Sequence, residues 1–258
     1  MAYIKEYWDN KEERARQARK HTKEMAEKYS KEIEESVKNT RIYNPTFYCL
    51  DKKEGRKTEI KVIDADTVHA GKIYNGEGKV ALLNFSSYKN AGGMFIKGSK
   101  AQEECLCHAS YLYNVLSQFN DKFYDWNCSH KNRALYLNRG LYSPDIIFNG
   151  EFKCDVITCA APNKSAAQKY QDISDEENRE ELKSRIRFVL DIAKDNNVDV
   201  LILGAYGCGV FGQNPKEVAN IFKEYLNTTH KDLFSKVIFA IPDEKYGNFG
   251  AFKKVFGE

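Results

Sequence analysis

The feature that most constrains the fold is a strand, a polar loop and a helix that follow one another in the first half of the chain. Lys79–Leu83 is a short apolar run preceded by Gly78, which predicts a buried β-strand. After Gln102, apolar residues recur at helical spacing, so a helix is expected to begin near Gln102. The residues on this stripe are Cys105, Leu106, Ala109, Leu112, Tyr113 and Leu116.

The loop between them, Asn84–Phe95, is rich in polar side chains and contains two adjacent glycines. Gly92 and Gly93 allow positive φ and let a ligand approach the backbone closely. Glu103 and Glu104 then lie in the first turn of the helix. The pattern predicts a ligand-binding loop that leads into a carboxylate pair. A plain surface loop before an acidic helix start is the alternative, because the helix dipole favours Glu there.

A second glycine-rich loop, Gly204–Gly212, follows the apolar run Val198–Leu203, which predicts another buried strand. Asn214 is a favourable N-cap and Pro215 a favourable first residue for the helix that follows. Free backbone amides beside a helix N-terminus form a natural cradle for a diphosphate. A tight connection without a ligand is the alternative. No Gly-Lys-Ser/Thr follows the loop, which excludes a Walker loop.

The rest of the chain alternates strands with helices, which predicts an α/β sandwich with a mostly parallel sheet. Residues 10–38 contain neither Gly nor Pro and predict one long helix or two short ones. With no internal repeat or low-complexity linker, one domain with an N-terminal helical arm is expected. Further strands are predicted at 46–50, 58–63, 134–137, 145–148, 152–159 and 236–241, and further helices at 176–196 and from 214.

Composition argues against several classes of partner. The 40 basic and 37 acidic residues nearly cancel, so no extended nucleic-acid surface is implied. No apolar run approaches the length of a membrane span, and the polar first residues do not resemble a secretory signal. Seven cysteines at irregular spacing indicate reduced thiols in a cytoplasmic protein. Their spacing lacks the paired pattern that is usual for zinc, so no metal site is predicted.

The first loop resembles the signature of the bacterial-type poly(ADP-ribose) glycohydrolases, a branch of the macrodomain superfamily. That signature is a Gly-Gly-Gly loop, a short gap and Gln-Glu-Glu. Here Gly92, Gly93 and Met94 stand at the glycine positions, and Gln102-Glu103-Glu104 completes the pattern. The second loop resembles the macrodomain phosphate loop, and Ala161-Pro162-Asn163 resembles an Ala-Pro-Asn segment of the same family.

The resemblance implies a three-layer α/β/α macrodomain-like sandwich with a mixed, mostly parallel sheet. It divides the chain into an N-terminal helical extension, residues 1–45, and a glycohydrolase domain, residues 46–258.

The chain departs from the family at Met94, where a third glycine is usual. A glycine there can take positive φ, a conformation that costs methionine about 1 kcal/mol or more. The Met94 side chain is also expected to narrow the pocket for the distal ribose.

The implied activity is hydrolysis of the O-glycosidic ribose–ribose bond of poly(ADP-ribose), or of a related conjugate, with release of ADP-ribose. By resemblance, Glu104 is the general acid/base and Glu103 holds ribose hydroxyls. Neighbouring helix residues point about 100° apart, which fits two separate roles. The implied substrate-binding residues are Asn84, Asn90, Gly92, Gly93, Gln102, Gly204, Ala205, Tyr206, Gly207, Cys208, Gly209, Val210 and Phe211, with Asp66 at the adenine amine. No cofactor is implied.

Three alternatives stay open on the sequence. A binding module that reads ADP-ribose without cleaving it needs both loops but not Glu104. A hydrolase of mono-ADP-ribosylated protein, or of a small ADP-ribose derivative, would carry the same residues. A purely structural α/β domain would leave both glycine loops unexplained. The expected partner is ADP-ribose or poly(ADP-ribose) attached to proteins, with no direct nucleic-acid or membrane contact, and the chain is expected to be a monomer.

Overall fold

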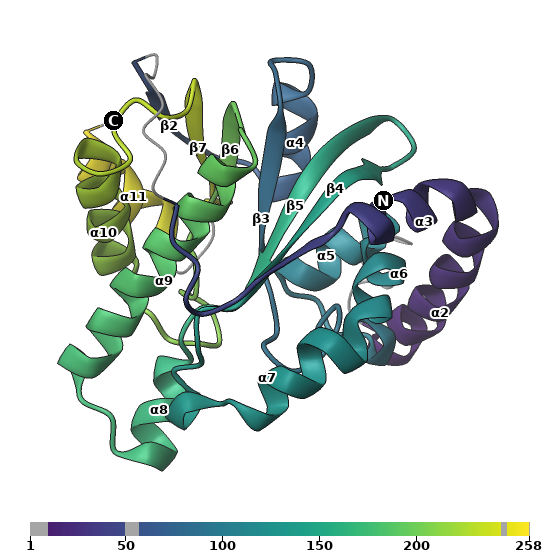
Figure 1. The fold of residues 1–258 in the computed structure, drawn as a ribbon, viewed down its shortest axis with the longest axis horizontal. Helices are drawn as coiled ribbons and strands as arrows, with labels where there is room; N and C mark the ends of the chain where they lie inside the picture. The colour runs from purple at the N-terminus through teal and green to yellow at the C-terminus, as the bar shows by residue number, and fades with distance from the viewer. Residues whose placement is uncertain (1–9, 50–56, 244–246, 258) are drawn as a thin grey trace.

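The computed structural model describes residues 10–49, 57–243 and 247–257 of the chain. A seven-stranded sheet forms its centre, in the order β1-β4-β5-β3-β6-β7-β2 (Figure 1). The strands are β1 (Arg41–Tyr43), β2 (Glu59–Ile63), β3 (Val80–Phe85), β4 (Gly140–Phe148), β5 (Phe152–Cys159), β6 (Val200–Leu203) and β7 (Lys236–Ala240). The β1–β4 and β4–β5 pairs are antiparallel, whereas β5, β3, β6, β7 and β2 pair in parallel. The predicted mixed, mostly parallel sheet is therefore confirmed.

The helices lie mostly between the strands along the chain. They are α2 (Lys11–Lys28), α3 (Ser30–Asn39), α4 (Thr67–Tyr74), α5 (Gln102–Ala109), α6 (Leu112–Leu116), α7 (Asp125–Ser129), α8 (Lys164–Gln171), α9 (Asp175–Asp195), α10 (Pro215–Asn227) and α11 (Asn248–Phe256), with the short turns η1 (Phe95–Lys97), η2 (Ser117–Phe119), η3 (Asn120–Tyr124) and η4 (Asn132–Ala134). None of the described helices is long and apolar enough to cross a membrane.

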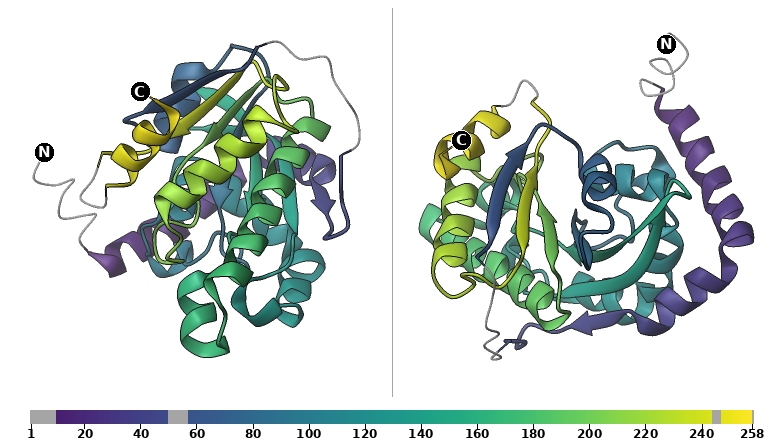
Figure 2. Two further views of the ribbon diagram at one scale, coloured as in Figure 1. Left: turned by 90° about the vertical axis from the view of Figure 1, so that its left-hand side faces the viewer. Right: turned by 90° about the horizontal axis from the view of Figure 1, so that it is seen from above.

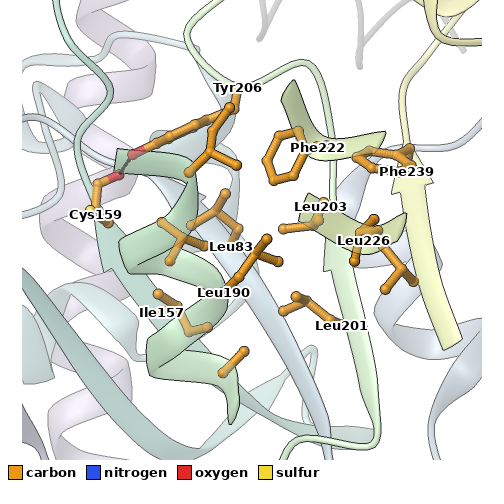
Figure 3. Close-up of a cluster of buried hydrophobic side chains, with 14 of the residues drawn as sticks. Leu83, Ile157, Cys159, Leu190, Leu201, Leu203, Tyr206, Phe222, Leu226 and Phe239 are labelled. Carbon is orange, nitrogen blue, oxygen red and sulfur yellow. Dashed lines mark hydrogen bonds between the residues drawn. The ribbon is translucent and has the colours of Figure 1, made fainter. Parts of the chain in front are cut away.

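Helices cover both faces of the sheet, which gives three layers (Figure 2). Side chains of β3 alternate between two cores: Leu83 packs with residues of α9, α10 and α11, and Leu82 packs with residues of α4, α5 and α6. This alternation follows from the two-residue period of a strand. Figure 3 shows the first core, in which Leu190 of α9 and Phe222 of α10 lie over the sheet.

The N-terminal arm consists of two helices, α2 and α3, that meet at Tyr29. It lies on the opposite side of the molecule from α11 (Figure 2). Arg14 of α2 is buried, and its Nε donates a 2.7 Å hydrogen bond to the carbonyl of Gly98. A Cβ on Gly98 would lie 2.1 Å from the Lys11 carbonyl oxygen. The arm therefore packs directly on the segment that precedes α5. The division of the chain at residue 45 stays a prediction.

Two predicted strands are wrong. Residues 46–49 form a turn and irregular chain (Leu50 lies outside the described residues), and the strand that pairs with β4 is Arg41–Tyr43 instead. Phe47 packs its ring on Tyr43, with the ring centroids 4.6 Å apart, so its apolar character is used outside the sheet. Residues 134–137 also form no strand. Positive φ at Ala134 and Tyr136 is incompatible with β structure.

The parallel strands place the two predicted ligand loops at one edge of the sheet. The loop after β3 and the loop after β6 both leave the carboxyl ends of neighbouring parallel strands. The segments after β2 and β7 leave the same edge. Ligands of open α/β sheets bind at this edge, so the search for a functional site begins there.

Candidate active site

The carboxylate pair lies at the start of α5 and is almost completely buried. Glu103 is 3% exposed and Glu104 is 5% exposed. Charged side chains are rarely buried to this extent unless protein groups satisfy them. Here the partners include three backbone amides and the side-chain amide of Asn84.

Glu103 is held by the end of β3 and by the loop that follows it. Its Oε2 accepts a 2.7 Å hydrogen bond from the Ser87 amide, and its Oε1 accepts one of 3.2 Å from Asn84 Nδ2. Burial raises the pKa of Glu103 to about 8, against these hydrogen bonds, which lower it, and with a smaller upward effect of Glu104. Burial therefore favours the protonated form of Glu103 in the ligand-free protein.

Glu104 is held by both ends of the segment between the diglycine and α5. Its Oε1 accepts a 2.9 Å hydrogen bond from the Met94 amide, and its Oε2 accepts one of 2.9 Å from the Ala101 amide. The second bond caps the first turn of α5 from the third helical position. Its carboxyl group is thus fixed in orientation by the backbone on both sides.

Gly93 packs directly against both carboxylates. A Cβ built on it would lie 2.6 Å from Glu104 Oε1 and 2.9 Å from Glu103 Oε2, and its φ is +61°. Gly92 also has positive φ, and its Cβ would lie 2.7 Å from the Tyr113 ring. Glycine is therefore required here both for backbone conformation and for the close approach of the loop to the carboxylates.

Met94 adopts ordinary backbone geometry, with φ −110°. The expected cost of a left-handed methionine is therefore wrong, because this position does not use positive φ. The Met94 side chain is 39% exposed and lines a hollow together with Asn90 and Gly93. Its effect on the distal ribose pocket stays a prediction.

The second loop leaves several amides free for a ligand. Among the described residues, the amides of Gly209, Val210 and Phe211 donate no hydrogen bond, and Val210 is 88% exposed. Asn214 caps α10 by accepting hydrogen bonds from the amides of Lys216 and Glu217, as the sequence predicts. An anion that approaches the loop would therefore meet unpaired donors beside a helix N-terminus.

A cavity of about 370 Å³ lies between the two loops and the end of β7. Asp66, which caps α4 through the His69 amide, borders it, and Phe85 and Ile241 supply apolar walls. The lining is Asp66, Thr67, Val68, Phe85, Lys100, Ala101, Gln102, Cys105, Leu106, Ala205, Ala240, Ile241, Pro242 and Asn248. Asp66 and Ala205, both predicted as binding residues, thus lie at one cavity.

Three of the predicted binding residues have their side chains engaged within the protein. Asn84 is fully buried against Glu103 and Thr158. Gln102 accepts from the Phe85 amide and donates to the Leu83 carbonyl and to Thr67. Tyr206 is fully buried and donates to the Cys159 carbonyl. In the ligand-free protein these side chains position strands and carboxylates, and Gln102 also lines the cavity. Their contact with a ligand stays a prediction.

The remaining predicted residues lie in the two loops, outside the lining of the cavity. Asn90 is exposed at the hollow beside Gly93, and Phe211 packs its ring near Tyr136, with the ring centroids 6.2 Å apart. A Cβ on Gly204 would meet the Ala240 carbonyl oxygen at 2.8 Å, so this glycine permits close approach of β7. Gly207 has φ +75°, and Cys208 Sγ lies 3.7 Å from the Tyr206 carbonyl oxygen.

Sequence reasoning missed Ser87, whose amide holds Glu103, and Ile241 and Pro242, which line the cavity. Backbone donors leave no trace in residue type, so Ser87 had no sequence signal. Ile241 and Pro242 could have been found, because they follow the predicted strand 236–241 at the same edge as both loops.

Comparison with known proteins identifies the family of the chain. The family model described as microbial-type PARG, catalytic domain, matches residues 11–149, which include the arm, the diglycine loop and α5. The chain belongs to the microbial-type poly(ADP-ribose) glycohydrolase (PARG) family. No curated protein matches the chain.

Solved PARG structures share the fold over nearly the whole chain. PARG from Thermomonospora curvata is 27% identical, with a TM-score of 0.83 over 93% of this chain and 100% of that chain. The same protein bound to the inhibitor ADP-HPD gives 27% identity and a TM-score of 0.79 over 93% of this chain and 99% of that chain. PARG from Deinococcus radiodurans in complex with ADP-ribose gives 29% identity and a TM-score of 0.78 over 87% and 96%. Fold and family, as predicted, are confirmed.

No group of three or more His, Cys, Asp or Glu side chains in the described part of this PARG-family chain could hold a metal ion.

The raised pKa of Glu103 predicts a pH-dependent stability. Because the folded state holds a proton that the unfolded chain releases above pH 4.5, stability falls as pH rises from about 4.5 to about 8. Glu103→Gln mimics the protonated carboxyl and should flatten that fall. Melting temperatures across this pH range, for the parent and Glu103→Gln, measure it, with the exposed Glu176→Gln as control. Parallel curves for parent and Glu103→Gln would contradict a buried protonated Glu103.

Proposed function

We propose that this protein hydrolyses the ribose–ribose O-glycosidic bond of poly(ADP-ribose) and releases ADP-ribose. The observation that carries the proposal is the carboxylate pair, buried and held by backbone amides against a diglycine loop in a chain of the PARG family. A cavity of about 370 Å³ and a loop with free amides adjoin that pair, as a nucleoside diphosphate sugar requires.

The ligand would span the edge of the sheet from the cavity to the carboxylates. Adenosine would occupy the cavity, where the exposed Asp66 carboxylate can accept a hydrogen bond from the adenine amine. The diphosphate would lie over Gly207–Phe211, and the distal ribose against Asn90, Gly92 and Gly93. Solved PARG structures in complex with ADP-ribose and with the inhibitor ADP-HPD support a ligand of this class.

In the proposed mechanism Glu104 is the general acid and then the general base. It donates a proton to the leaving ribose oxygen as the bond from that oxygen to C1 of the distal ribose breaks, through an oxocarbenium-like centre. Its carboxylate then takes a proton from the water that attacks C1, which restores the acid. Glu103 would hold ribose hydroxyls. The backbone bonds to both oxygens of Glu104 support this role, because they fix the carboxyl where one group must serve two steps.

The alternative functions differ in whether they require the carboxylate pair Glu103 and Glu104. A reader of ADP-ribose has no use for two buried carboxyls, which are costly to bury. A hydrolase of mono-ADP-ribosylated protein, or of a small ADP-ribose derivative, would use the same carboxylate pair. The cytoplasmic location and the monomeric state stay predictions.

The deciding experiment is incubation of the purified protein with poly(ADP-ribose) and, in parallel, with mono-ADP-ribosylated protein, followed by detection of free ADP-ribose. Release from polymer supports the proposal. Binding of ADP-ribose without release from either substrate would leave the protein a reader instead.

Met94 is expected to slow the enzyme on polymer. Met94→Ala removes the side chain without adding backbone freedom, because the parent φ of −110° is ordinary. We expect kcat/KM on poly(ADP-ribose) to rise several-fold while ADP-ribose affinity stays nearly constant. Initial rates and calorimetric titration measure the two. An unchanged rate on polymer would make the methionine a neutral replacement for the family's glycine.

A further inference from the structure

A second hollow, of about 340 Å³, adjoins the diglycine loop and shares Asn90 and Gly93 with the proposed distal-ribose site. We name it the Met94 hollow. Its lining is Lys89, Asn90, Ala91, Gly93, Met94, Ile96, Lys97, Tyr113, Asn120, Tyr124 and Asp125. These residues come from the diglycine loop, η1, α6, η3 and the first residue of α7.

The Met94 hollow and the adenosine cavity are each lined by residues next to the carboxylate pair. Gly93 lines the hollow, and a Cβ on it would lie within 2.6 Å of Glu104 Oε1. Ala101 and Gln102, which flank the pair at the start of α5, line the cavity. A ligand that fills the cavity and reaches the carboxylates therefore directs whatever is bonded beyond its distal ribose toward the hollow.

One lining residue carries a buried hydroxyl without a partner among the described residues. Tyr124 is 2% exposed, and its hydroxyl makes no hydrogen bond with any described residue. Buried polar atoms are nearly always paired, so an unpaired one is a position where a ligand group or a bound water is expected.

Two cations border the hollow. Lys89 and Lys97 are exposed, and neither forms an ion pair within the described ranges. Asp125 is the only carboxylate in the lining. The lining of the hollow therefore carries a net positive charge. Lysine ammonium groups bind phosphates as point charges, so a diphosphate would be attracted here.

We propose that the Met94 hollow binds the leaving ADP-ribose unit of the polymer, with Lys89 and Lys97 at its diphosphate. The inference rests on the proposed function and adds the leaving-group half of the substrate to it. A conjugate with a small neutral leaving group gains nothing from the two lysines, whereas every internal polymer bond is followed by a diphosphate.

The test is the double variant Lys89→Gln/Lys97→Gln on two substrates. For poly(ADP-ribose) at low salt, kcat/KM should fall roughly 5- to 10-fold, as expected for two exposed ion pairs. Its dependence on salt concentration should flatten, because fewer charge contacts are screened. For ADP-ribose linked through its distal ribose to a neutral aryl alcohol, kcat/KM should be unchanged.

The matched control is Lys153→Gln/Lys231→Gln, which makes the same charge change at two exposed positions. Lys153 lies near the amino end of β5, and Lys231 precedes the amino end of β7. It should leave both substrates unaffected. Equal losses on both substrates, or no loss on polymer, would overturn the inference while the proposed function stands. A parent protein that cleaves neither substrate would overturn the proposed function, and the inference with it.

Discussion

Glu104→Gln is expected to lower turnover of poly(ADP-ribose) by about 10²- to 10⁴-fold, the contribution typical of a general acid–base group. Glutamine keeps the shape of the side chain but can neither donate the proton to the leaving oxygen nor accept one from water. Because the cavity and the phosphate loop are untouched, ADP-ribose should still bind. Initial rates of ADP-ribose release and calorimetric titration of ADP-ribose measure the two effects separately.

Stability must be followed beside activity for this variant. Both oxygens of Glu104 accept backbone amides, from Met94 and Ala101. A glutamine has one acceptor oxygen, so one amide would face an NH₂ group, at a cost of about 1–3 kcal/mol. Rates are therefore measured well below the melting temperature of the variant. Unchanged turnover would remove Glu104 from the mechanism, and loss of turnover in Glu103→Gln alone would reverse the two roles.

The sequence predicted those parts of the fold whose signals are local. The helix at Gln102 begins where the apolar spacing and the acidic first turn place it, and β5 has the predicted bounds, Phe152–Cys159. Asn214 and Pro215 start α10 as their capping chemistry requires. The failed strands at 46–50 and 134–137 are short runs of apolar and aromatic residues, for which a strand cannot be told from a packed turn without tertiary context.

The candidate site was predicted by residue type better than by role. The diglycine, the acid pair and the phosphate loop meet at one edge of the sheet, as strand order requires. Asn84, Gln102 and Tyr206 were predicted to bind the ligand, and the structure shows that each also bonds to protein atoms. A polar side chain beside a ligand loop has the same sequence signal whether it faces the ligand or supports the residue that does. Only packing separates the two.

Gly93→Ala is expected to reduce turnover about 100-fold, because it displaces both carboxylates at once. The added methyl would lie 2.6 Å from Glu104 Oε1 and 2.9 Å from Glu103 Oε2, distances that force one or both groups to move. Each carboxyl is fixed by loop amides, so the movement also strains the loop. Misplacement of catalytic groups by about 1 Å can cost about 10²-fold in rate.

A control separates this contact from backbone strain. Alanine at φ +61° also costs about 1 kcal/mol or more, whatever it touches. Gly76 has φ +90° with no heavy atom within 4 Å of its added Cβ, so Gly76→Ala carries strain of the same kind away from the carboxylates. Both variants should melt at lower temperature than the parent, but only Gly93→Ala should lose turnover. Near-parent turnover in Gly93→Ala would mean that the carboxylates tolerate displacement, and that their observed positions are not the catalytic ones.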